Sequence, residues 1–525
     1  MHLSGGCVNS ETSRKTFQSI LFLKQPGPTA PDSPETPDYF GDLNLDQIVQ
    51  SVMLNYTGYN LTPFFLQPLT DLKSISYRQE IMKELENQAL MSAVKSFSYQ
   101  LVTMRERLPK QEKQYFRYER ERCFLNATSI YCQAITSFSE ELSGFGLISE
   151  GLKSFRQYLW DYIGSARFRE LKADTDALLS SLSEVRYCLH INSGRVSMRP
   201  HEAQSDYSAT IEAIFEKFRR AAVKDYLARD LRPEGMNHVQ AQVLDGVAKL
   251  YPEIFRMLES FYQKHAGFLD EVVSRFDREI QFYISYLSHI DKFRRAGHKF
   301  CYPRLSKSSK EIEACETFDL ALAEKLIADK TDVITNDFFL RGPERIFVVT
   351  GPNQGGKTTF ARTFGQLHYL AALGCPVPGV DASLFLCNRL FSHFEKEENI
   401  TTLRGKLQDD LLRIRDILDK AKPDSVIIIN EIFSSTTLKD AVFLGRKILL
   451  RLTDLDCLGV FVTFLDELST FNEKTVSMVS TVRADDPTVR MFKLERKAAD
   501  GLAYALSIAE KYHLTHEQLK MRLER

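Results

Sequence analysis

Residues 346–359 read Ile-Phe-Val-Val-Thr-Gly-Pro-Asn-Gln-Gly-Gly-Lys-Thr-Thr. They begin as a buried apolar strand and continue into the pattern G-x(4)-G-K-T, from Gly351 to Thr358. In such a loop, glycines let backbone N–H groups close round phosphate oxygens, Lys357 supplies a positive charge, and the Thr358 hydroxyl can ligate Mg²⁺. A helical pattern follows over residues 360–373. The alternative is a glycine-rich turn with a solvated lysine, but the strand before the loop favours a phosphate-binding loop.

The bulk composition describes an ordinary globular protein. The chain has 525 residues, 43% of them hydrophobic, which leaves room for several domains. The formal net charge of −1 means that nucleic-acid binding would depend on local patches. The nine cysteines form no C-x-x-C pair, so neither a zinc site nor a disulfide framework is predicted. Without a signal-type segment or an apolar stretch of about 18 residues, we expect a reduced, cytoplasmic protein outside the membrane.

Three parts are predicted along the chain. Residues 1–37 hold five prolines among small and acidic residues, which predicts a disordered tail. Residues 38–300 follow mostly helical spacing, interrupted by a short hairpin near 184–199. Residues 301–525 alternate apolar β-runs with helices, as at 345–350, 425–430, 458–463 and 488–494. The predicted fold class is therefore α plus α/β, with a helical block followed by a nucleotide-binding domain.

A phosphate loop needs a second strand that ends in acidic residues. Residues 425–431, Ser-Val-Ile-Ile-Ile-Asn-Glu, supply the strand and one acid. Glu431 is the candidate general base, although a surface acid at a strand end is the alternative. Asn430 stands where many ATPases have aspartate; its oxygen can serve the Mg²⁺ site but brings no charge. We therefore expect hydrolysis to suffer more than nucleotide binding.

At these residues the chain resembles the MutS family of DNA-repair ATPases. Its loop is similar to the family's G-P-N-M-G-G-K-S-T, with Gln354 in place of methionine. Residues 333–337, Val-Ile-Thr-Asn-Asp, resemble the F-[VI]-x-N-[DP] segment that lies over the nucleotide base, and Val333 replaces its aromatic residue. The resemblance implies that ATP is contacted by Gly351, Pro352, Asn353, Gln354, Gly355, Gly356, Lys357, Thr358, Thr359, Val333, Ile334 and Asn336. It also implies that Mg²⁺ is held at Thr358 and Asn430, with Glu431 and Lys357 as the catalytic residues.

Other segments resemble the family with departures. Residues 430–437 are similar to D-E-I-G-R-G-T-S, and residues 460–468 to F-A-T-H-Y-x-E-L, but Phe464 stands where the family has a histidine that senses the γ-phosphate. The family's dimer partner donates a loop S-T-F-x-x-E; residues 405–410 occupy that position, with Gly405 in place of serine. Residues 497–505 resemble G-x-A-x-x-S-Y-G-I. These departures lead us to expect slow hydrolysis.

The resemblance implies a helical lever and clamp block joined to an ABC-like P-loop ATPase domain. Residues 68–79 are similar to the start of the family's lever domain. The implied protein is a homodimeric clamp that binds DNA and uses ATP and Mg²⁺ in repair or recombination. Only the proline-rich tail precedes the lever here, so we expect recognition of DNA structure rather than direct reading of mismatches.

Two alternatives and two basic stretches stay open. A nucleotide-dependent protein scaffold that binds ATP but hardly hydrolyses it is the main alternative, and a transporter-type ATPase is a weaker one. Residues 104–122 mix basic and aromatic side chains, and Lys217, Arg219, Arg220 and Lys224 form a second basic cluster. Both stretches are candidate DNA contacts. An ordinary ion-paired helix surface explains both as well or better.

Overall fold

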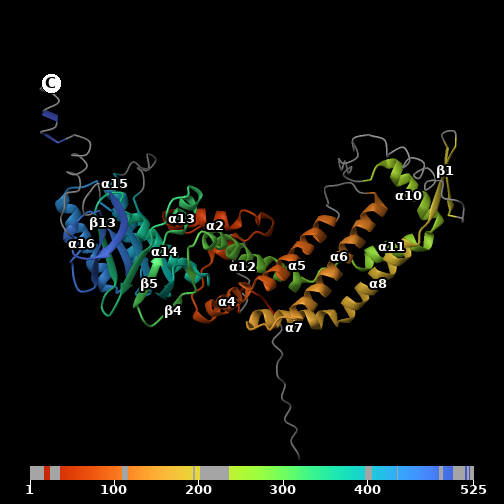
Figure 1. Ribbon diagram of the computed structural model, residues 1–525, viewed down its shortest axis with the longest axis horizontal. Coiled ribbons are helices and arrows are strands. Elements are labelled where there is room, and N and C mark those ends of the chain that lie inside the picture. Colours follow the sequence, from red (N-terminus) through yellow and green to blue (C-terminus); the bar gives the residue numbers. More distant parts are fainter. Residues whose placement is uncertain are drawn as a thin grey trace, which may run out of the picture. The chain divides into compact units, whose positions relative to one another are not determined.

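The computed structural model describes residues 17–23, 36–108, 116–192, 195–201, 236–395, 405–433, 435–483, 489–499, 515–516 and 519–520. Contacts divide the chain into two compact units, which are described separately (Figure 1). The helical unit comprises Met1–Phe17, Gln88–Leu147 and Lys153–Asp277, and the sheet unit comprises Gln18–Asn87, Ile148–Leu152 and Arg278–Arg525. This division does not coincide with the predicted boundary at residue 300, because the first helices pack with the sheets.

The helical unit is built on the antiparallel pair α5 (Gln88–Arg107) and α6 (Arg117–Ser143), which lie side by side (Figure 1). On α5, Leu90, Val94, Phe97 and Leu101 repeat at helical spacing and are buried. The Phe97 ring stacks on Phe138 of α6, with 4.3 Å between ring centroids. The other helices are most of α7 (Glu150–Ile163), α8 (Ala166–Ser183), α10 (His238–Leu250), α11 (Pro252–Lys264) and the start of α12 (Glu271–Arg295).

A hairpin lies in the helical unit near the predicted position. β1 (Tyr187–Asn192) pairs antiparallel with β2 (Arg195–Pro200), with Tyr187 opposite Pro200. The predicted basic cluster at residues 217–224 lies outside the described residues.

The sheet unit starts with short helices. These are α1 (Tyr39–Asp42), α2 (Leu45–Met53), η1 (Thr57–Tyr59), α3 (Thr62–Leu66) and α4 (Leu72–Leu85). After α12 come β3 (Phe300–Cys301), β4 (Arg304–Ser306), β5 (Ile312–Thr317), α13 (Leu320–Ala328), β6 (Asn336–Leu340), β7 (Ile346–Thr350), α14 (Lys357–Ala372), β8 (Val377–Pro378), β9 (Asp381–Phe385) and β10 (Arg389–Phe394). The last elements are α15 (Lys406–Lys420), β11 (Ser425–Asn430), α16 (Leu438–Asp454), β12 (Leu458–Val462), η2 (Asp466–Leu468), β13 (Thr475–Val482) and β14 (Arg490–Arg496).

The main sheet has six strands in the order β10-β11-β12-β7-β13-β14. All neighbouring pairs are parallel except β13 and β14, which are antiparallel. A second sheet has the order β4-β9-β5-β6, and β3 pairs with β8. Helices connect the parallel strands of this sheet. The chain thus combines a mostly helical unit with a unit of helices and sheets, and the predicted presence of both α and β structure is confirmed.

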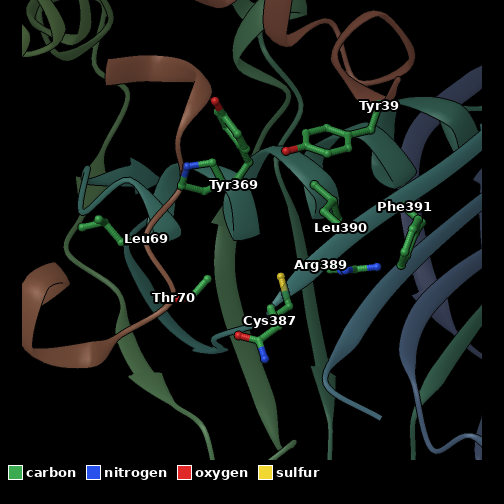
Figure 2. A pocket seen from close by; sticks show the side chains of 10 residues that line it. Tyr39, Leu69, Thr70, Tyr369, Cys387, Arg389, Leu390 and Phe391 are labelled. Carbon is green, nitrogen blue, oxygen red and sulfur yellow. The ribbon is translucent and has the colours of Figure 1, made fainter. Parts of the chain in front are cut away.

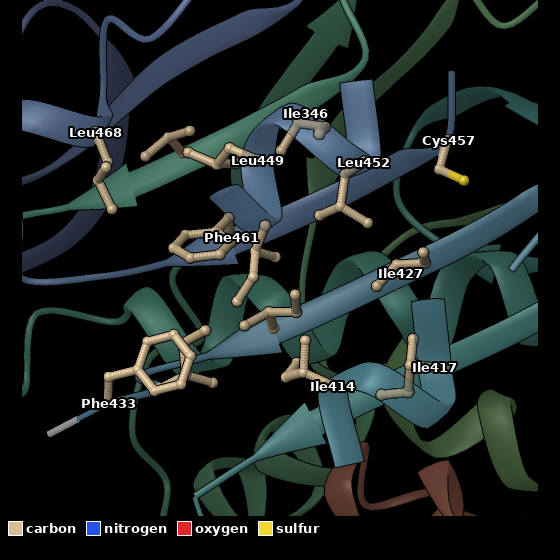
Figure 3. Close-up of a cluster of buried hydrophobic side chains, with 14 of the residues drawn as sticks. Ile346, Ile414, Ile417, Ile427, Phe433, Leu449, Leu452, Cys457, Phe461 and Leu468 are labelled. Carbon is tan, nitrogen blue, oxygen red and sulfur yellow. The ribbon is translucent and has the colours of Figure 1, made fainter. Parts of the chain in front are cut away.

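The two faces of the main sheet carry different cores. On one face, Ile346 of β7, Ile427 of β11 and Phe461 of β12 pack with side chains of α15 and α16 (Figure 3). On the other face, Phe347 of β7 meets Phe360 of α14, with 5.8 Å between ring centroids. Because neighbouring residues on a strand point to opposite faces, the apolar run of β7 fills both cores.

The predicted disordered tail is wrong for residues 18–23, which pack into the sheet unit. Ser19, Ile20 and Leu21 are buried, and the Glu279 carboxylate accepts hydrogen bonds from Ser19 Oγ (2.7 Å) and from the Ile20 amide (2.9 Å). Tyr283 donates to the Ile20 carbonyl at 2.7 Å. The proline-rich composition of residues 26–37 hid this short apolar run, which is stabilised by tertiary contacts that composition cannot reveal.

Among the described helices, none combines the length and the apolar character needed to cross a lipid bilayer.

Candidate nucleotide site

The glycine-rich loop (residues 351–356) joins β7 to α14 at the carboxyl edge of the main sheet. β7 is buried along its whole length, and α14 begins at Lys357. Gly351 and Gly356 have φ angles of 114° and 93°, in the left-handed region that favours glycine. Ligands of open α/β sheets bind at the carboxyl ends of the strands, and the amino terminus of a helix attracts anions. The loop therefore lies where an anionic ligand is expected.

Ser480 of β13 contacts the loop, and sequence reasoning missed this residue. Its Oγ donates to the Gly355 carbonyl at 2.5 Å. A Cβ atom added to Gly355 would lie 2.2 Å from that Oγ and 2.9 Å from the Pro352 carbonyl oxygen, so the backbone itself favours glycine there. The pairing of β13 with β7, with Val479 opposite Thr350, brings Ser480 to the loop. Only this long-range pairing identifies Ser480, since no local motif marks it.

Lys357 is folded back over the loop and is 3% exposed. Its Nζ donates to the Gly351 carbonyl (2.9 Å) and the Pro352 carbonyl (3.2 Å), and contacts Asn353 Oδ1 at 3.3 Å. The Glu431 carboxylate lies 3.5 Å from Nζ. Burial lowers the pKa of Lys357, and Glu431 partly opposes this shift. The ammonium group thus has three neutral oxygens and one carboxylate around it, and a phosphate could replace the neutral oxygens.

Thr358 connects the loop to the end of β11. Its Oγ1 donates to Asn430 Oδ1 at 3.0 Å, and Asn430 is buried. Magnesium prefers oxygen ligands and usually binds one or two protein groups together with waters and phosphate oxygens. A hydroxyl and an amide oxygen next to the Glu431 carboxylate fit such an ion.

Glu431 follows β11 in a left-handed conformation, with φ of 51°. Its amide donates to the Val462 carbonyl at 3.0 Å, and its side chain stays 31% exposed. Phe433, two residues later, also has a positive φ of 63° and is buried. A positive φ at a residue other than glycine costs about 1–3 kcal/mol and often marks functional sites. The turn holds the carboxylate beside Lys357, where it can accept a proton from a water molecule.

Asn336, a predicted contact of the nucleotide base, forms two hydrogen bonds with the backbone of β14. Its Nδ2 donates to the Phe492 carbonyl (3.2 Å), and its Oδ1 accepts from the Leu494 amide (2.7 Å). Phe492 has a φ of 56° and is 48% exposed. A Cβ on Gly356 would lie 3.7 Å from Phe492 Cβ. Phe492 is thus a candidate ligand contact beside the loop that sequence reasoning missed; an exposed aromatic residue in the basic run Arg-Met-Phe-Lys was the available signal.

The remaining residues predicted for the site contribute fewer polar groups to it. Val333 is half-buried and Ile334 is 43% exposed, and both precede β6. Phe464 is 48% exposed just after β12 and has no polar atom to offer a phosphate. Gly405 is the N-cap of α15 and makes no side-chain capping bond. Thus Lys357, Thr358, Asn430 and Glu431 meet at one place, whereas Val333 and Ile334 add no hydrogen-bonding group.

Two arginines in the described part of the basic stretch 104–122 are ion-paired within the helical unit. Arg105 contacts Asp277 at 2.7 Å, and Arg117 contacts Glu121 at 3.1 Å. Arg117 also pairs with Glu259. Residues 109–115 lie outside the described residues. For Arg105 and Arg117, these contacts favour an ion-paired helix surface.

Comparison with known proteins finds one family over the carboxyl-terminal part. A family model described as MutS domain V matches residues 347–521. The protein "Endonuclease MutS2" of Thermus thermophilus is 30% identical over 198 residues, which cover 36% of this chain and 26% of that protein. "DNA mismatch repair protein MutS" of Petrotoga mobilis is 24% identical over 268 residues, covering 50% of this chain and 32% of that protein.

A eukaryotic relative matches in a similar way. "DNA mismatch repair protein MSH3" of Yarrowia lipolytica is 26% identical over 197 residues, which cover 36% of this chain and 20% of that protein. The matched part therefore spans between 20% and 32% of these three relatives.

Proposed function

Because the chain belongs to the MutS family, we propose that it is an ATP-dependent DNA-binding protein, a homodimeric clamp that recognises DNA structure in repair or recombination and hydrolyses ATP slowly. The observation that carries this proposal is the hydrogen bond of 3.0 Å between Thr358 and Asn430. It joins the glycine-rich loop to the end of β11, directly before Glu431, as the two halves of an ATP site require.

In this proposal the loop binds the phosphates of ATP. Backbone N–H groups at the start of α14 and the Lys357 ammonium neutralise negative charge. Thr358 and Asn430 would hold Mg²⁺, which would supply positive charge to neutralise the phosphates. Glu431 would orient the attacking water and accept its proton. Nucleotide binding would bias the dimer between open and closed clamps, and hydrolysis would reset it.

We expect slow hydrolysis because the side chains of Asn430 and Phe464 lack two groups that would assist it. Asn430 brings an amide where a carboxylate would add a negative charge near the metal. Phe464 is 48% exposed and cannot donate a hydrogen bond to a phosphate. Both departures should destabilise the transition state of hydrolysis more than they weaken binding of the nucleotide. ATP should therefore bind tightly and be hydrolysed slowly.

DNA binding and dimerisation are proposed from the family. Two of the three relatives described above are named as DNA mismatch repair proteins, which supports DNA as the partner. Arg105 and Arg117, two of the cations in residues 104–122, are paired with acids, so we assign no DNA contact to these two.

A turnover assay beside a nucleotide-binding assay tests the proposal, with no DNA and with duplex, branched or single-stranded DNA. We expect slow ATP hydrolysis that one of these DNAs stimulates, and a Glu431→Gln variant that binds ATP but loses turnover by about 100-fold or more. Tight ATP binding with no turnover under any condition, and no DNA retention, would instead support the nucleotide-dependent scaffold. Absence of ATP binding would contradict both.

A further inference from the structure

The outer edge of β10 forms a second candidate binding site, at the amino end of the main sheet. β10 ends the strand order of this sheet and pairs with β11 alone. Arg389 begins the strand and Phe394, opposite Asn430, ends it, so Arg389 lies roughly 16 Å along the strand from the nucleotide site. The two sites are therefore distinct.

The backbone of β10 has free hydrogen-bonding groups along this edge. In a strand with one neighbour, alternate N–H and C=O groups face away from that neighbour. Among the described residues, no group bonds to the outward-facing backbone of residues 389–393. The covering helix α1 reaches β10 through Asp42, which accepts from Ser392 Oγ at 2.7 Å, near the other end of the strand. Within the described part of the chain, the first half of the edge makes no such hydrogen bond and faces Tyr39, Leu69 and Thr70 across a pocket.

A pocket opens beside this half of the strand (Figure 2). Leu390 and Phe391 both line it. Because adjacent side chains of a strand point to opposite faces, a pocket that touches both residues lies at the edge of the strand. Its other side is formed by Leu69 and Thr70 from the segment before α4. The pocket therefore lies where an added strand would place a side chain.

The pocket has the size and lining for one apolar side chain. Its volume is about 190 Å³. Pockets that enclose whole small molecules measure about 300–1,000 Å³, so this one suits a single large residue. The Tyr39 and Tyr369 rings contribute aromatic surface, with their centroids 6.1 Å apart.

Arg389 gives the pocket a positive charge. It is exposed and lines the pocket, and no ion pair is found for it within the described residues (Figure 2). Asp424, which directly precedes the strand partner of Arg389, Ser425, accepts a hydrogen bond from the neighbouring Asn388 instead. An incoming carboxylate would thus meet an available guanidinium group.

From the open edge, the one-residue pocket and Arg389, we propose that β10 binds an extended peptide segment of a partner protein. The segment adds as a strand to the edge at residues 389–391, inserts one large apolar side chain into the pocket, and carries an acidic residue beside it that pairs with Arg389. Main-chain hydrogen bonds supply affinity in this mode of recognition, while the pocket and the charge supply specificity.

The test uses the full chain and an array of fluorescent hexapeptides. Each peptide alternates threonine with valine, leucine, isoleucine, phenylalanine or methionine and carries one aspartate. We expect at least one peptide to bind with a Kd below about 1 mM. The Arg389→Glu variant should weaken that peptide about tenfold and strengthen a version in which lysine replaces the aspartate. Thr70→Trp, which narrows the pocket mouth from an exposed position, should also weaken it.

Control measurements distinguish loss of strand pairing and loss of specific side-chain contacts from misfolding. Arg415→Glu makes the same charge change at an exposed position of α15 and should leave peptide binding unchanged. ATP affinity should be the same in all variants, which reports intact folding of the sheet unit. Methylation of alternate peptide nitrogens should weaken binding about tenfold, because it blocks strand pairing. The proposal fails if no peptide binds below about 1 mM, or if binding ignores either Arg389→Glu or backbone methylation.

Discussion

The two ends of helix α14 are held in different ways. At its amino end, Lys357 is surrounded by loop carbonyls and the Glu431 carboxylate, 2.9 to 3.5 Å away. At its carboxyl end, the Leu373 carbonyl accepts a hydrogen bond of 3.0 Å from the fully buried Arg78. The amino end offers groups that a ligand can replace, whereas the carboxyl end has a permanent cation that complements the helix dipole. Within this one helix, the amino end is arranged for a ligand and the carboxyl end for structural support.

Replacing Arg78 should have the largest effect on stability. Arg78 also donates to the Leu21 carbonyl at 3.0 Å, and its guanidinium lies 5.2 Å from the ring centroids of Phe22 and Phe282. Arg78→Ala orphans two buried carbonyls and opens a cavity, so we expect the free energy of unfolding to fall by about 3–5 kcal/mol. Urea denaturation of the intact chain measures this. Arg389→Ala, an exposed control, should change it by less than about 0.5 kcal/mol.

Burial of the Arg78 guanidinium away from water is unfavourable, and it lowers the pKa of Arg78. Replacing Arg78 also removes this desolvation cost. A loss below about 1 kcal/mol would mean that this relief cancels the lost bonds. The carboxyl end of α14 would then owe little to Arg78.

Replacing Lys357 should act on binding rather than on stability. Lys357→Ala removes the cation that would face the phosphates, so we expect ATP affinity to fall about 100-fold, or about 2.7 kcal/mol. Because burial lowers the pKa of this lysine, the unliganded variant should be as stable as the parent or more so. Titration with a fluorescent ATP analogue and thermal unfolding without nucleotide measure the two effects. Lys439→Ala, at an exposed lysine of α16, is the control. A parallel loss of stability would contradict the contrast between the two ends.

A histidine between these ends should make stability depend on pH. His368 is buried in α14, its Nδ1 lies 2.8 Å from the Phe364 carbonyl, and burial lowers its pKa to about 4. In the unfolded chain the imidazole titrates near 6.5, so between these values the unfolded state binds more protons. Stability should therefore decrease by about 2 kcal/mol as pH falls from about 6.5 to about 5.

His368→Leu should flatten that part of the pH profile, measured as the difference between variant and parent in urea unfolding at each pH. Carboxylates that titrate in the same range cancel in this difference. Equal slopes in the two proteins would show that His368 is protonated in the folded state.

The sequence predicted the parts of the nucleotide site that are local and missed those that depend on pairing. The order of strand, loop and helix around Lys357 is encoded within fourteen neighbouring residues, and an apolar run followed by Asn430 and Glu431 is equally local. Ser480 and Phe492 reach the loop only because β13 pairs with β7 and β14 pairs with β13. The buried residues 18–23 were hidden for the same reason, since their partners Glu279 and Tyr283 lie about 260 positions away.

The smallest predicted effect tests whether such a distant residue matters for the loop. Ser480→Ala removes the hydrogen bond to the Gly355 carbonyl, and we expect ATP affinity to fall about fivefold, or about 1 kcal/mol. Ser477→Ala is a matched control on the same strand, because Ser477 Oγ is buried without a hydrogen-bond partner among the described residues. That substitution should leave ATP affinity unchanged and should not reduce stability, since it removes an unsatisfied polar group. Equal effects of the two substitutions would show that β13 supports the loop by packing alone, and the amino end of α14 would then be organised by its local sequence.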